Sequence, residues 1–216
     1  MNTGAPRELV GAVAAAIVLV IVASVAQSDA GVSGLVVLIC ELLFAGGAGY
    51  LLDDAAAALT TVTPVGVWRR RLPGLLSGAA LISVAWGLVL VVLRWQESLP
   101  PVWLVSGELA VLCVLALAAA AVLAARGESE PGGLVAPAVG LLGIGALIVD
   151  LFLEAAIFVP WDGSGGDGVR VAWSSLGGLA ILVIAAASRD PARSGPLRAT
   201  TARLRSARSP FEGRTG

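Results

Sequence analysis

The chain has 216 residues, of which 57% are hydrophobic and only 13% are charged, and its formal net charge is −1. This balance excludes an ordinary soluble domain, in which charged residues make up about a quarter of the chain. Histidine and lysine are absent, which excludes Ser/His/Asp hydrolysis, histidine-ligated zinc, and a P-loop ATPase, whose lysine contacts the β- and γ-phosphates.

Six apolar stretches follow one another along the chain: residues 9–26, 32–52, 73–93, 102–125, 134–159 and 171–188. Each meets the requirement of roughly 20 residues for a helix that crosses ~30 Å of hydrocarbon. A backbone in lipid must satisfy its own hydrogen bonds, so we expect helices. We therefore predict an all-α, polytopic membrane protein with a six-helix transmembrane domain over residues 1–188. Residues 189–216 form an Arg-rich tail.

Arginine placement predicts the orientation. With both termini cytoplasmic, twelve arginines lie on the inner side and only Arg94 and Arg170 lie outside, as the positive-inside rule requires. Tryptophan supports the same arrangement, because this side chain prefers the membrane interface. Four tryptophans fall at the outer ends of the last four spans: Trp95, Trp103, Trp161 and Trp173.

Four acids lie within the apolar stretches: Glu41, Glu108, Asp150 and Glu154. A charged side chain costs about 3 kcal/mol at the centre of an isolated span, so we expect all four to face the bundle interior, a partner or water. Asp150 and Glu154 are four residues apart and share a helical face. The acids are candidates for a polar pathway or a proton-carrying site. The alternative is that each is protonated or hydrogen-bonded, for example to Ser83 or Ser106, and only fixes helix packing.

Several other residue types have structural interpretations. Cys40 and Cys113 lie inside spans and match no metal-ligand spacing, so we expect small core residues and no disulfide. The small residues of 45–49 fit close helix packing, and so do four in the fifth stretch: Ala136, Gly140, Gly143 and Gly145. The Gly-rich stretch 161–168 has no complete calcium-binding pattern and is expected to be a turn.

The segment between the second and third spans has helix signals of its own. Asp53 and Asp54 precede a run of alanines, which suits a helix N-terminus through capping and the dipole, and Pro64 ends the pattern. An arginine cluster then begins the third span. We predict a short cytoplasmic helix over about residues 53–64; the alternative is an ordinary connecting loop.

With these features the chain resembles the transmembrane subunits of ATP-binding-cassette exporters of the type-2 permease class. It is most similar to the small, Arg-rich, Lys-poor permease-like proteins of high-GC actinobacteria. The resemblance rests on residues 53–71, on six spans with both termini inside, and on the Gly-rich outer connection between the last two spans. It implies a coupling helix that docks into a separate ATPase. The matching residues are Asp53, Asp54, Ala56, Ala57, Leu59 and Thr60, followed by the inner anchor Arg69, Arg70 and Arg71.

The expected function is therefore that of a permease subunit in an ATP-driven exporter of the bacterial inner membrane. ATP belongs to the partner, so this chain is expected to bind no cofactor and to catalyse no bond-making. A homo- or hetero-dimer of membrane subunits is expected, with anionic lipid rather than nucleic acid at the tail. Two alternatives remain: an accessory or scaffolding subunit of a larger complex, and a small proton-coupled carrier that uses Asp150 and Glu154.

Overall fold

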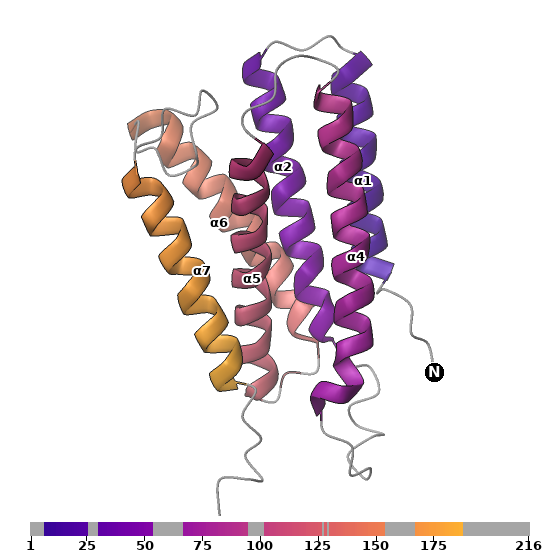
Figure 1. Cartoon of the computed structure of the whole chain (residues 1–216), viewed down its shortest axis with the longest axis vertical. Coiled ribbons are helices and arrows are strands. Elements are labelled where there is room, and N and C mark those ends of the chain that lie inside the picture. Colours follow the sequence, from indigo (N-terminus) through magenta and orange to yellow (C-terminus); the bar gives the residue numbers. More distant parts are fainter. Residues whose placement is uncertain are drawn as a thin grey trace, which may run out of the picture.

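The computed structural model describes residues 7–25, 30–53, 67–126, 128, 130–153 and 167–187. In this part of the chain the elements are six α-helices and one 3-10 turn. They are α1 (Arg7–Val25), α2 (Ala30–Gly49), η1 (Tyr50–Leu52), α4 (Val67–Arg94), α5 (Val102–Ala125), α6 (Pro131–Leu153) and α7 (Asp167–Ala187). Figure 1 shows them as an upright helical bundle.

All six α-helices are long and apolar enough to span a membrane. The prediction of an all-α fold with six candidate spans is thereby confirmed, and the chain has the organisation of a multi-pass membrane protein. Successive helices run in alternating directions, so α1 begins and α7 ends at the same end of the bundle (Figure 1). Which side of the membrane this end occupies stays a prediction.

The helix starts differ most from the predicted ones in α4, α6 and α7. α4 begins at Val67 and passes through Pro73, where we predicted its start. A proline inside a helix removes one backbone hydrogen bond, but ending the helix there would leave several polar groups unpaired near lipid. α6 begins at Pro131 rather than residue 134, because proline suits the first helical position. α7 begins at Asp167, so residues 167–168 are helical and not part of a turn.

α2 is the central helix. In its candidate span 72% of the residues are buried, against 11 to 28% in the other five. It packs against α1, α4, α5 and α6, whereas the main contact of α7 is with α5 (Figure 1). A displacement of α2 would therefore change the packing of four other helices.

Small residues bring α2 close to its neighbours, as the sequence predicted. A Cβ at Gly46 would lie 3.6 Å from the Cα of Ala136 in α6, and one at Gly47 would lie 2.8 Å from a methyl group of Leu9 in α1. A Cβ at Gly143 would meet the side chain of Leu42. Gly140 and Gly145, which we also assigned to helix contacts, have no such neighbour within 4 Å. The close contacts thus join α1, α2 and α6.

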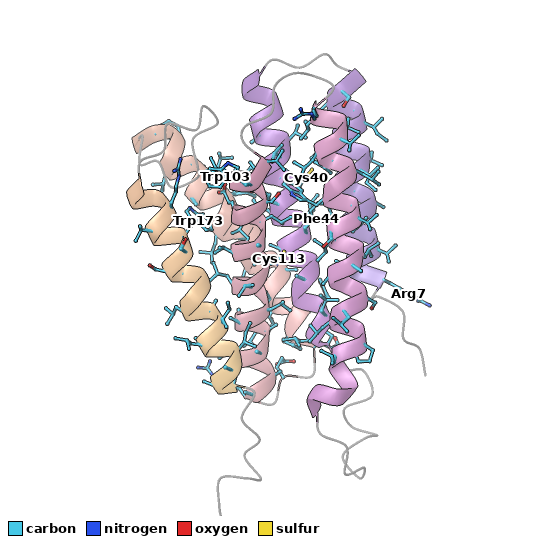
Figure 2. All side chains as sticks on the ribbon, viewed as in Figure 1. Arg7, Cys40, Phe44, Trp103, Cys113 and Trp173 are labelled. Atoms are coloured by element: carbon cyan, nitrogen blue, oxygen red, sulfur yellow. The ribbon has the colours of Figure 1, made fainter. Side chains whose placement is uncertain are left out.

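Two of the four tryptophans expected at the membrane interface lie within the described residues. Trp103 in α5 and Trp173 in α7 lie toward the end of the bundle opposite to Arg7 (Figure 2). The guanidinium carbon of Arg170 lies 5.2 Å from the ring centroid of Trp103, within range of a cation–π contact that ties α7 to α5. Trp95 and Trp161 lie outside the described residues.

Candidate functional site

Two of the predicted acids come together in the interior of the bundle. Glu41 of α2 and Glu108 of α5 are 2% and 6% exposed, and their helices pack against each other. Their carboxyl groups interact electrostatically. We call these residues the Glu41–Glu108 pair; they bring two carboxyl groups to the contact between α2 and α5.

The surroundings of Glu41 are apolar or weakly polar. Glu41 follows Cys40 in α2 and lies near Cys113 of α5, the helix that packs against α2. One turn along α2, Phe44 meets the ring of Trp86 edge to face, with 6.1 Å between the centroids. Aromatic and aliphatic side chains therefore make up most of the surroundings of Glu41.

Glu41 is poorly satisfied. Its Oε1 is buried and accepts no hydrogen bond in the described part of the protein. Ser106, one of the hydroxyls expected to help, accepts a hydrogen bond of 3.0 Å from the indole N–H of Trp86. Ser83 donates to the carbonyl of Ala79 in its own helix at 2.8 Å. A buried polar atom without a hydrogen bond costs about 1–3 kcal/mol, so Glu41 is an expensive residue to retain for packing alone.

The sequence could not have selected this pair. It drew attention to Asp150 and Glu154, which share a helical face, whereas Glu41 and Glu108 are far apart in the chain and carry no pairing signal. Asp150 lies in the last described turn of α6 with its side chain outside the described part, and Glu154 lies outside the described residues altogether. Their predicted role in a pathway stays a prediction.

A second polar contact lies at the end of the bundle where α1 begins. Asp53 follows η1 in an extended conformation, and its Oδ1 accepts a hydrogen bond of 2.7 Å from the backbone N–H of Gly132. Gly132 is the second residue of α6, so its N–H is one of the amides that a helix leaves unpaired. A carboxylate in this position also offsets the positive end of the helix dipole.

The same contact is tightly packed. A Cβ at Gly132 would lie 2.6 Å from the Cα of Tyr50 and 2.6 Å from its ring. A Cβ at Gly49 would lie 3.0 Å from a methyl group of Val135. We call Tyr50, Asp53 and Gly132 the Asp53 junction. It joins the end of α2, through η1, to the first turn of α6.

One of the predicted ATPase-docking residues, Asp53, belongs to this junction. Of these residues the structure describes only Asp53. The others lie outside the described residues: Asp54, Ala56, Ala57, Leu59 and Thr60. The predicted anchor residues Arg69, Arg70 and Arg71 belong to the first turns of α4, with their side chains outside the described part. Sequence reasoning had assigned Asp53 to a helix start and to the docking segment, and it missed the contact of this residue with α6.

Two apolar grooves lie on the described part of the bundle. One of about 440 Å³ lies between α1, α2 and α6. Another, of about 820 Å³, lies between α5, α6 and α7, and Leu42 of α2 also lines it. Apolar side chains line nearly all of both, so they suit acyl chains or apolar helices better than polar solutes. Within the described residues no group of three or more metal-ligating side chains is assembled.

Comparison with known proteins found no match to a protein-family model, to a curated protein or to a solved structure. The class of the protein is therefore defined by its own fold: a helical bundle with six candidate membrane spans, a buried carboxyl pair beside its central helix, and a polar junction at one end.

Proposed function

We propose that the chain is the membrane-embedded permease subunit of an ATP-driven exporter, with the 53–64 segment and both termini on the cytoplasmic side of a bacterial cell membrane. The observation that supports this proposal best is the Asp53 junction. The proposed docking segment begins at Asp53, a residue that continues directly from α2 and η1 and is hydrogen-bonded to α6.

This connection gives a physical route for force. A partner that moves the segment after Asp53 pulls on the lower end of α2 and on the first turn of α6 together, because the 2.7 Å hydrogen bond and the packing of Gly132 on Tyr50 link them. α2 in turn contacts α1, α4 and α5. Coupling between distant sites needs such a contiguous set of packed elements.

The role of this chain in the proposed cycle is positional. ATP is bound and hydrolysed by the partner, in keeping with the absence of lysine and histidine from this sequence. Two membrane subunits, identical or similar, form the complete permease, and the Arg-rich tail lies against anionic lipid.

The test is to purify the tagged chain from its native membranes in mild detergent, as wild type and with Ala56→Glu and Ala57→Glu combined. We expect an ATP-hydrolysing subunit to accompany the wild type in a fixed ratio. The double substitution should leave membrane insertion unchanged and remove most of this subunit, because two charges would be forced into the docking surface.

Glu128→Arg provides the matched control. Glu128 is exposed in the turn between α5 and α6, at the same end of the bundle, and this variant should retain the ATPase. If the wild type carries no ATPase, the chain is an accessory subunit or a carrier. If the doubly substituted chain retains the ATPase as the wild type does, the partner docks elsewhere.

A second candidate function is proton-coupled transport, and the Glu41–Glu108 pair favours it. A carrier of this kind needs an ionisable group inside the bundle, where Glu41 lies. The two candidates differ in their energy source. Transport in vesicles without ATP that stops when the proton gradient is dissipated would select the carrier.

A further inference from the structure

Glu41 has the most deeply buried carboxyl group among the described residues. It is 2% exposed on the central helix, and its Oε1 accepts no hydrogen bond. Its nearest acidic neighbour is the carboxyl group of Glu108, on the helix α5 that packs against α2. Removing a carboxylate from water and placing it beside a second carboxylate are both unfavourable to the ionised form.

No described basic residue of the surrounding helices lies near enough to Glu41 to favour its ionised form. Cys40 in α2 and Cys113 in α5 are the remaining ionisable neighbours with which Glu41 interacts. α1 has ionisable groups only at its start, Arg7 and Glu8. The described side chains of α4 include one such group, Arg94, at the helix end. Asp150 lies in the last turn of α6, and Asp167 and Arg170 lie in the first turn of α7.

We propose that Glu41 is a proton-binding site, and that the carboxyl group of Glu108 across the α2–α5 contact makes proton binding there sensitive to the state of the bundle. The proton adds to a carboxylate oxygen of Glu41 from water and returns to water when it is released; no covalent bond between heavy atoms changes. The proposal holds for an exporter and for a carrier alike, because it concerns only what Glu41 binds.

Binding and release act on the central helix. With the proton bound, Glu41 is neutral and can donate a hydrogen bond, so α2 and α5 can pack closely. Without it, Glu41 is a carboxylate in apolar surroundings near the carboxyl group of Glu108, which favours separation of the helices or entry of water. The site thus links proton occupancy to the position of α2.

The experiment is infrared spectroscopy of the purified full-length protein in lipid nanodiscs at neutral pH, in water and in heavy water. A protonated carboxyl group gives a carbonyl stretching band that is separate from those of carboxylates and amides and shifts in heavy water. We expect such a band in the wild type. The component of this band that belongs to Glu41 should be lost in Glu41→Gln, change frequency in Glu108→Gln, and stay unchanged in Glu128→Gln.

Glu41→Leu, which is closer to the apolar surroundings, repeats the loss if the glutamine variant does not fold. The Glu108→Gln frequency change tests the site with Glu41 intact. Absence of the band from the wild type at neutral pH would overturn the proposal. So would a band that survives in Glu41→Gln or Glu41→Leu but disappears in Glu108→Gln, because the proton would then reside on Glu108. These readings do not depend on ATP or on a partner, so they can fail while the exporter proposal holds.

Discussion

Replacing Gly132 by alanine is expected to destabilise the protein by about 1–3 kcal/mol, the usual cost of forcing extra volume into a packed interior. The new Cβ would lie 2.6 Å from the Cα of Tyr50, a backbone atom that cannot turn aside as a side-chain end can. Either α6 or η1 must shift, and the hydrogen bond between Asp53 and Gly132 would be strained. The free energy of unfolding in mixed micelles measures this loss.

Gly133→Ala is the matched control. The two glycines are adjacent in the first turn of α6, but a Cβ at Gly133 would have no heavy atom within 4 Å. Alanine is a better helix former than glycine by roughly 0.5–1 kcal/mol, so this variant should be as stable as the wild type or slightly more stable. Equal loss in both variants, or no loss in Gly132→Ala, would show that the Asp53 junction is not tightly packed.

The second large effect is expected at Glu41. Glu41→Leu should leave the bundle as stable as the wild type or stabilise it by up to about 4 kcal/mol, because replacing a buried ionisable group by an apolar one of similar volume removes a desolvation cost. Its function should be lost at the same time. We therefore expect transport, or ATP hydrolysis in complex with the partner, to fall to background in a protein that is fully folded.

Val37→Ala shows whether the stability assay is sensitive to this part of the bundle. Val37 is 1% exposed on the same helix, and truncating it leaves a cavity, so its stability should fall. Should Glu41→Leu lose as much stability as Val37→Ala and keep full activity, Glu41 would be a packing residue, and the proton site would have to be abandoned.

Much of the fold follows from hydropathy. Lipid offers the backbone no hydrogen-bond partners, so the six apolar stretches must form helices. α5 has the predicted bounds, Val102–Ala125. Helix ends were less predictable. A turn that carries Arg69 to Arg71 is too polar for hydrocarbon but is still helical, because helical hydrogen bonding continues beyond the apolar stretch. The sequence also did not predict that α2 is the central helix, because all six spans are similarly apolar.

The sequence indicated which residues cost free energy when they are buried in a membrane, but it did not reveal their contacts. Glu41 and Glu108 stood out as acids in apolar stretches. Their proximity depends on how α2 packs on α5, which no local pattern encodes. Asp53 illustrates the same limit. Its position suited a helix start in the following segment, yet its carboxylate binds Gly132, whose unpaired amide becomes a partner only when α6 reaches η1.

The proposed function requires that the end of the bundle with the Asp53 junction faces the cytoplasm, where ATP is. Site-directed labelling of intact cells with a membrane-impermeant maleimide tests this most directly. The background carries Cys40→Ala and Cys113→Ala, and single cysteines replace residues at the two ends of the bundle: Glu8 and Glu128 near the junction, Arg94 and Trp103 at the opposite end. All four positions are exposed.

We expect Arg94→Cys and Trp103→Cys to be labelled in intact cells. Glu8→Cys and Glu128→Cys should react only after the membrane is permeabilised. Labelling of Glu8→Cys and Glu128→Cys from outside would place the Asp53 junction away from ATP and contradict the exporter, and labelling of all four without permeabilisation would contradict a bundle that spans the membrane.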